Sequence, residues 1–272
     1  MSGHRHLAPA VLVSVSSLVA AFAGCNSGSS GSHGTTAPPT DAGIDAPPPV
    51  VVTNENESKQ SGRVIRAQTD EGVAGATVTI AGKSVVTGVN GDYEILVPRN
   101  VPYRVAVTAD GFYKLLEQEW IVREATHVRG DTNLLKTETA NLLAELLPGR
   151  KAEKGIVVVK VHPLPPCETE DGSTLTIDPP GEALVRYFSG PIPSGEQASV
   201  QGGTDLSAAF YNVDVGVPLT VAVHSAKCQQ APFPLDLGEV TYTGKVLTEP
   251  GEAFAYFRAF LRETNVSDAG SD

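Results

Sequence analysis

The sequence predicts an all-β protein: two tandem antiparallel β-sandwiches of Greek-key type, joined by a short helix and preceded by a signal peptide and a disordered tether. Three observations support this fold class. Apolar and polar residues alternate in several short runs, as they do in half-buried strands. The 272 residues include 27 glycines and 20 prolines, which suits a chain with many turns. Two stretches of the chain also repeat one order of elements.

Residues 1–24 are expected to form a secretory signal peptide. Arg5 stands near the start, and an apolar run from Leu7 to Phe22 follows it, with small residues at the exit. Serines interrupt this run, and it is too short for a membrane-spanning helix, which needs about 20 predominantly apolar residues. The segment therefore indicates export rather than a membrane span.

The signal peptide leads into Ala21-Phe22-Ala23-Gly24-Cys25, which resembles the lipobox of bacterial lipoproteins, with Phe22 where that family usually carries leucine. The resemblance implies that Cys25 carries a diacylglycerol and that a membrane is the partner of this end of the chain. Asn26 follows Cys25, which by the same resemblance favours the outer membrane, on its periplasmic or its surface-exposed face. An ordinary cleaved leader followed by a chance cysteine is the alternative.

Residues 25–59 are expected to be a lipidated cysteine followed by a disordered tether. The tether is rich in serine and glycine at first, then in threonine, proline and aspartate, and finally in other polar residues. Such a composition cannot bury enough apolar surface to offset the entropy of the chain. The folded part would therefore be held at a distance from the membrane.

The internal repeat relates residues 62–112 to residues 155–225. The corresponding elements are Thr77–Ile80 and Thr174–Ile177, Asp92–Val97 and Ala208–Val213, and Val101–Val107 and Val217–Val223. Five of seven residues agree in the last pair, at an offset of 116. The offset of the first pair is only 97, so the second copy is expected to carry 19 extra residues around Tyr187 to Thr204.

Residues 60–136 are predicted to form the first sandwich. Val105 and Val107 fall on one face of a strand, and Arg104 and Ala106 fall on the other. Asn90-Gly91, placed after Val85-Val86 and before Tyr93 and Ile95, predicts a β-hairpin, because both central residues of its turn need a positive φ.

This module resembles the carboxypeptidase regulatory-like (transthyretin-like) family over about 75 residues. The matching residues are Gly62–Val64, Gly72–Ile80, Thr87, Asn90–Tyr93, Val97-Pro98 and Gly111-Phe112. The resemblance implies a seven-stranded sandwich with Greek-key connections, similar to the Ig-like architecture. Carbohydrate-binding modules overlap with this fold.

Residues 137–154 are expected to be a helical connector, residues 155–264 the second sandwich, and residues 265–272 a disordered tail. In the connector, a helix over Glu138 to Leu147 would place four leucines on one apolar face, before Pro148-Gly149 ends it. The second module would close on the alternating strand from Ala253 to Leu261.

Cys167 and Cys228 are the cysteines that remain once Cys25 carries lipid. Both lie just past predicted strands of the second module, and an exported protein meets an oxidising compartment. We expect them to form a disulfide; two free thiols or a metal-binding pair are the alternatives.

No catalytic, cofactor-binding or metal-binding residue is predicted. The sequence contains no His-Glu-x-x-His, no Gly-x-Ser-x-Gly and no phosphate loop. The histidines beyond the signal peptide are isolated and are interpreted as exposed surface residues: His33, His127, His162 and His224. The carboxylates beside Cys167 are interpreted as solvated loop charges: Glu168, Glu170 and Asp171.

Two further patterns admit a binding interpretation. Arg129-Gly130-Asp131 spells an integrin tripeptide, which we interpret as chance or as a turn between strands. Tyr93, Tyr103 and Tyr211 fall on core-facing strand positions. Phe112, Tyr113 and Trp120 cluster after the predicted hairpin and could form a face for sugar stacking, but a role in the core is favoured for them.

The net charge of −11 argues against nucleic acid, because phosphate binding needs a basic patch that the sequence lacks. We expect a non-catalytic, lipid-anchored envelope protein that displays β-sandwich modules for structural or protein-interaction roles. Binding of carbohydrate or peptidoglycan is the alternative, on fold analogy alone. An uncharacterised hydrolase ranks third.

Overall fold

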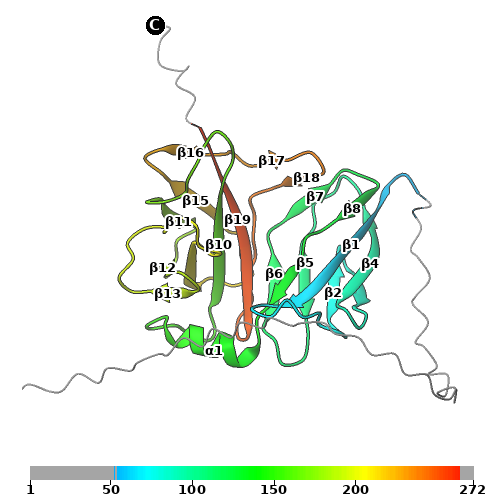
Figure 1. Cartoon of the computed structure of the whole chain (residues 1–272), viewed down its shortest axis with the longest axis horizontal. Helices are drawn as coiled ribbons and strands as arrows, with labels where there is room; N and C mark the ends of the chain where they lie inside the picture. Colours follow the sequence, from blue (N-terminus) through cyan, green and yellow to red (C-terminus); the bar gives the residue numbers. More distant parts are fainter. Residues whose placement is uncertain (1–51, 53, 264–272) are drawn as a thin grey trace, which may run out of the picture. The chain divides into compact units, whose positions relative to one another are not determined.

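A computed structural model describes residues 52 and 54–263 of the chain (Figure 1). The signal peptide, Cys25, most of the predicted tether and the tail from residue 265 lie outside the described residues. The first strand begins at Glu57, three residues before the predicted start of the first module. Within the described residues, no helix is long and apolar enough to cross a membrane.

The first half of the described chain contributes nine strands and one helix. Their bounds are β1 Glu57–Arg66, β2 Thr77–Ile80, β3 Lys83–Val86, β4 Asp92–Pro98, β5 Val105–Thr108, β6 Lys114–Glu117, β7 Trp120–Val122, β8 Thr126–Val128, β9 Thr132–Leu134 and α1 Thr137–Glu145.

The second half contributes the remaining ten strands. Their bounds are β10 Gly155–Pro163, β11 Thr174–Asp178, β12 Leu184–Ser189, β13 Ile192–Ser194, β14 Ala208–Val213, β15 Thr220–His224, β16 Cys228–Gln230, β17 Leu235–Asp236, β18 Val240–Tyr242 and β19 Ala253–Glu263. The prediction of an all-β protein with one short helix is confirmed.

The first sandwich packs two sheets around one apolar core. One sheet has the order β4-β1-β8, with β9 also paired to β1, and the other contains β3-β2-β5-β6. Val64, Val78 and Val105 are fully buried between them, as the alternation of apolar and polar residues in these strands predicts.

The second sandwich repeats this arrangement. Its β11 pairs with β15 as β2 pairs with β5: Ile177 faces Val221 and Ile80 faces Val105. Both pairs fall at the positions that the sequence repeat equates, which confirms the correspondence between these strands. The predicted insertion contributes parts of β12 and all of β13, which form a hairpin at the edge of the sheet.

A single sheet of ten strands runs through both modules (Figure 1). Its main path is β13-β12-β14-β10-β19-β6-β5-β2-β3, with β16 paired to β19. The junction is the parallel pair of β19 and β6, in which Ala253 faces Lys114 and Tyr256 faces Glu117. Parallel pairs also join β1 to β8, β1 to β9 and β10 to β19, so the sheets are mixed rather than purely antiparallel.

A segment of the second half also completes the first sandwich. Strand β18 pairs with β7, so that Val240 faces Val122 and Tyr242 faces Trp120. Val240 is buried in the core of the first module. The described residues all belong to one compact unit, and separate folding of the two modules stays a prediction.

The hairpin predicted at Asn90-Gly91 is wrong. β3 pairs with β2, whereas β4 pairs with β1 in the other sheet, so the chain crosses between sheets at this turn. Gly91 has a φ of +82°, but Asn90 does not adopt a positive φ. A Cβ on Gly91 would lie 2.1 Å from the carbonyl oxygen of Val64. Close packing against β1 therefore requires glycine at this position.

The helix exists, but its predicted apolar face is only partly correct. The side chains that α1 and the residues after it bury are those of Ala140, Ala144 and Leu147. Leu142 is 64% exposed and Leu146 is 45% exposed.

Candidate functional site

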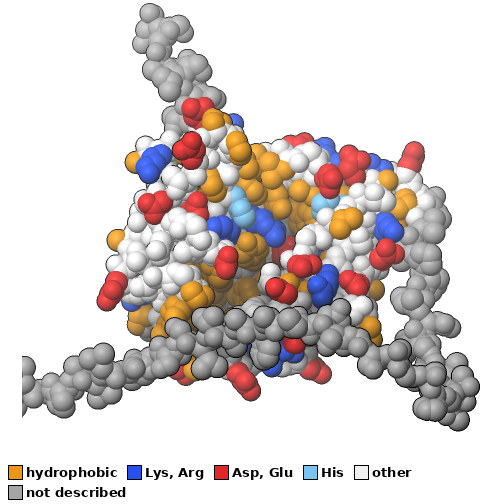
Figure 2. Space-filling model, viewed as in Figure 1, with side chains coloured by type: hydrophobic (Ala, Val, Ile, Leu, Met, Phe, Trp, Pro, Cys, Tyr) orange, Lys and Arg blue, Asp and Glu red, His pale blue; other side chains and the backbone are white. Residues whose placement is uncertain are grey.

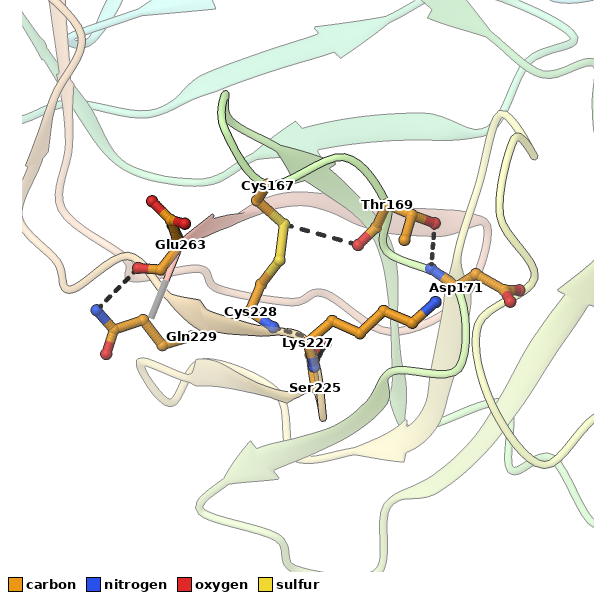
Figure 3. Close-up of a disulfide and its surroundings, with 8 residues drawn as sticks. All are labelled: Cys167, Thr169, Asp171, Ser225, Lys227, Cys228, Gln229 and Glu263. Atoms are coloured by element: carbon orange, nitrogen blue, oxygen red, sulfur yellow. Dashed lines mark hydrogen bonds between the residues drawn. A yellow bond between two sulfur atoms is a disulfide. The ribbon is translucent and has the colours of Figure 1, made fainter. Parts of the chain in front are cut away.

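The predicted disulfide between Cys167 and Cys228 is present (Figure 3). Cys167 lies in the loop after β10, and Cys228 begins β16, which pairs with the end of β19. The two Cα atoms are 6.1 Å apart, and both side chains are buried. The bond therefore ties the loop after β10 to β16, which in turn is paired with the end of β19.

The carboxylates beside Cys167 do not share one environment. Glu168 is exposed, but Glu170 is only 6% exposed, so its interpretation as a solvated loop charge is wrong. Glu170 Oε1 lies 3.3 Å from Lys160 Nζ and accepts a hydrogen bond from the backbone N–H of Gly203. Asp171 is exposed and accepts a hydrogen bond from the backbone N–H of Gly202. These carboxylates anchor loops.

The described histidines also differ from one another. His224 is exposed, as predicted. His127 is half-buried, with Nδ1 2.8 Å from Glu239 Oε2, so its interpretation as an exposed residue is wrong. His162 is half-buried, and its Nε2 atom is buried without a hydrogen-bond partner, so its interpretation as an exposed residue is wrong. Burial, followed by the charges of Arg258 and Lys160, lowers the pKa of His162 to about 4.

Arg129 is buried, so the tripeptide that begins there does not present its guanidinium to solvent. Its Nη1 donates a hydrogen bond to the hydroxyl of Tyr93 at 2.7 Å, and its Nη2 donates to Glu117 Oε2 at 2.6 Å. Burial acts to lower the pKa of Arg129, but Glu117 and Tyr93 more than offset it, and the pKa is raised. The guanidinium also lies over the ring of Trp120, 5.1 Å from its centroid.

The aromatic residues belong mainly to the core. Tyr93, Tyr103, Tyr113, Trp120 and Tyr211 are each no more than 5% exposed, which confirms the core interpretation for them. They offer no flat, open face on which a sugar ring could stack.

A row of rings connects the two modules, and no sequence pattern pointed to it. The neighbouring pairs are Tyr103–Trp120, Trp120–Tyr242, Tyr242–Phe260 and Phe260–His162, with centroid distances of 5.7, 6.5, 5.3 and 5.4 Å. The members come from β7, β18, β19 and β10 and from the bridge residue Tyr103. Only the folded chain brings them together, because more than 100 residues separate Trp120 from Tyr242.

A pocket of about 60 Å³ opens beside this row, where β7 and β18 meet β19. Its lining includes the pair Glu117–Arg129, together with Trp120, Tyr242 and Arg258. Figure 2 shows the surrounding hollow on this face, with an apolar floor and with basic and histidine side chains gathered in it. Among the described residues, no group of three or more His, Cys, Asp or Glu side chains is arranged to hold a metal ion.

Comparisons with solved structures give only distant similarity. The chain is 12% identical to the Bacillus anthracis TIE protein over 76% of this chain and 34% of that one, with a TM-score of 0.26. It is 9% identical to a streptococcal ancillary pilin over 78% of this chain and 64% of that one, with a TM-score of 0.25. It is 6% identical to the minor pilin of Streptococcus agalactiae over 79% of this chain and 100% of that one, with a TM-score of 0.23.

The chain thus spans less than two thirds of the length of the first two of these structures. A comparison with curated proteins finds no match. The matched part of the chain is the first module: residues 61–134 match the model of the carboxypeptidase regulatory-like domain, the family that this module resembles in sequence.

Proposed function

We propose that the chain is a non-catalytic cell-envelope protein, held to a membrane through lipid on Cys25, which displays two coupled β-sandwich modules for a structural or protein-interaction role. The observation that carries this proposal is the coupling itself. One sheet runs through both modules, and a strand from the second half completes the core of the first.

Polar contacts reinforce the coupling. Lys114 forms an ion pair with Glu249, Arg123 donates a hydrogen bond to Thr241 Oγ1, and the backbone N–H of Glu119 donates to the carbonyl of Lys245. Two modules fixed in this way present one surface, whereas modules on a loose linker would move independently. A fixed surface suits a display or interaction role, since less conformational entropy is lost when a partner binds.

Export is supported by two independent features. Disulfides persist in oxidising compartments and are rare in the cytosol, and Cys167 is joined to Cys228. The sequence around Cys25 resembles a lipobox and is followed by a tether of low hydrophobicity. We extend the proposal to the outer membrane on the identity of Asn26, which follows the cysteine.

Fractionation of cells that express the full chain tests the anchor. We expect the wild-type protein to sediment with membranes and to resist a high-salt wash, because a diacylglycerol with a further acyl chain anchors stably. The Cys25→Ser variant should move to the soluble fraction, and a Ser27→Ala variant serves as the matched control. Salt-resistant sedimentation of Cys25→Ser would contradict the anchor.

Affinity capture tests the display role. The Cys25→Ser chain, immobilised through its C-terminus, is exposed to envelope extract, purified peptidoglycan and a glycan array. Specific retention of an envelope protein supports the proposal. Retention of glycans alone would support the carbohydrate alternative instead, and turnover of a hydrolase substrate would contradict the non-catalytic role.

A further inference from the structure

Arg258 of β19 occupies an unusual position at the pocket between the modules. Its side chain is half-buried, and its guanidinium carbon lies 4.8 Å from the ring centroid of Tyr256 and 6.0 Å from that of Tyr242. Within the described part of the chain, no carboxylate lies within ion-pair distance of it. The guanidinium therefore contacts rings rather than a carboxylate, and the opposite charge that acts on it, that of Glu117, is already paired with Arg129.

The neighbouring cations are neutralised differently. Arg129 is paired with Glu117, and Lys160, which lies beside Arg258 in the β10–β19 register, is paired with Glu170. Both of these carboxylates are nearly fully buried and are already bound. Arg258 is thus left without a bound carboxylate in a pocket with a mainly polar lining, where its charge would attract an anion against the opposing charge of Asp131.

A second, independent feature also lacks a partner. Trp120 lines the same pocket and is only 4% exposed, yet its indole N–H is buried without a hydrogen-bond acceptor. Buried donors are rarely left unpaired, because the loss of hydration is then not compensated. An acceptor that reached this N–H from the pocket would satisfy the donor.

We propose that this pocket binds the carboxylate group of a small organic anion. A guanidinium presents parallel donors that match the two oxygens of a carboxylate, and the indole N–H of Trp120 would add a third. About 60 Å³ admits one functional group rather than a whole ligand, so the remainder of the anion would lie in the hollow outside. This inference goes beyond the display role and does not depend on the membrane anchor.

The single tryptophan of the chain makes the test direct, because its indole N–H gives one signal in a two-dimensional proton–nitrogen spectrum. The Cys25→Ser chain is titrated with sodium acetate at constant ionic strength, with sodium chloride as the balancing salt. We expect the indole signal to shift saturably, with a roughly millimolar dissociation constant for so small a ligand. D-glucuronate should bind more tightly than acetate, and D-glucose should give no shift.

Two variants locate the site. Arg258→Gln should weaken acetate binding at least about tenfold, because a charge-assisted pair of hydrogen bonds is lost. Arg262→Gln, an exposed position on the same strand, should leave it unchanged. Asp131 is exposed and lines the pocket, so its carboxylate would repel a bound anion. Asp131→Asn should therefore strengthen acetate binding roughly twofold. Asp110 does not line the pocket, and Asp110→Asn should leave acetate binding unchanged.

A wild-type indole signal that does not respond to acetate would overturn the proposal, as would the same acetate affinity in Arg258→Gln. If Arg258→Gln does not fold, the Asp131→Asn variant decides: weaker acetate binding, or the same affinity as in Asp110→Asn, contradicts an anion in this pocket. Arg258 would then serve only a structural role, through its contacts with the rings of Tyr242 and Tyr256.

Discussion

Arg129 and Glu117 form a buried ion pair at the junction of the two modules. The two side chains are 2.6 Å apart at Nη2 and Oε2, and the residues are 8% and 4% exposed. Glu117 lies at the end of β6, opposite Tyr256 of β19, so the pair stands where the shared sheet passes from one module to the other.

We expect Arg129→Ala to lower the free energy of unfolding by about 3–5 kcal/mol, because it leaves the Glu117 carboxylate buried without a partner. The double variant Arg129→Met with Glu117→Leu should recover most of this loss. Urea unfolding of the three proteins measures the effect. Arg66→Ala, which removes the partner of an exposed ion pair with Glu71, is the matched control and should cost less than about 1 kcal/mol. Equal losses for Arg129→Ala and Arg66→Ala would contradict a buried pair.

The disulfide should contribute about 4 kcal/mol to stability on the chain-entropy estimate, since 61 positions separate Cys167 from Cys228. Replacing both cysteines with alanine should lower the urea midpoint accordingly. A non-reduced digest should yield the two cysteine-containing peptides joined. Recovery of both as free thiols from protein made in an oxidising compartment would refute the pairing.

His162 should make stability depend on pH. Its pKa in the folded protein, about 4, is below the ordinary value of 6.5, so between these values the unfolded chain binds a proton that the folded chain does not. Stability therefore rises with pH across this window and is lost as pH falls through it. Because the ring is only half-buried, we expect roughly 1–2 kcal/mol between pH 7 and pH 4.5.

The difference between wild type and His162→Gln isolates this effect from other titrating groups. Urea unfolding at both pH values should give a smaller pH dependence for His162→Gln. The exposed His224→Gln variant should retain the wild-type dependence. An unchanged dependence in His162→Gln would show that the imidazole is hydrated in the folded state.

The first module should lose stability when it is isolated. A fragment of residues 52–136 lacks β18 and β19, so Val122 and Trp120 would lose Val240 and Tyr242, the β18 residues that lie opposite them. We expect the fragment to melt well below the intact chain, because burial of apolar side chains supplies much of its stability. Adding residues 235–263 in trans should raise the melting temperature. A fragment as stable as the intact chain would show that the modules are energetically independent.

The sequence alone determined the character of the strands. Alternation of apolar and polar residues predicts which side chains share one face of a strand, and Val105 and Val107, which it places on the same face, are both fully buried. The repeated order of elements equated Ile80 with Ile177, and their partners agree. Cys167 and Cys228 could be paired because no other cysteine is available once Cys25 is set aside.

Strand partners, in contrast, were decided only by the tertiary structure. The hydrogen-bonding edges of all strands carry the same backbone groups, so no local pattern specified that β4 would pair with β1 or that β19 would join β6. The environment of a charged side chain likewise depends on groups that arrive from elsewhere in the chain. Arg129 and His162 resemble surface residues in sequence. In the folded chain, Arg129 donates a hydrogen bond to the hydroxyl of Tyr93, and the ring of His162 stacks on that of Phe260. Long-range packing, which no short stretch of sequence encodes, therefore created the pocket.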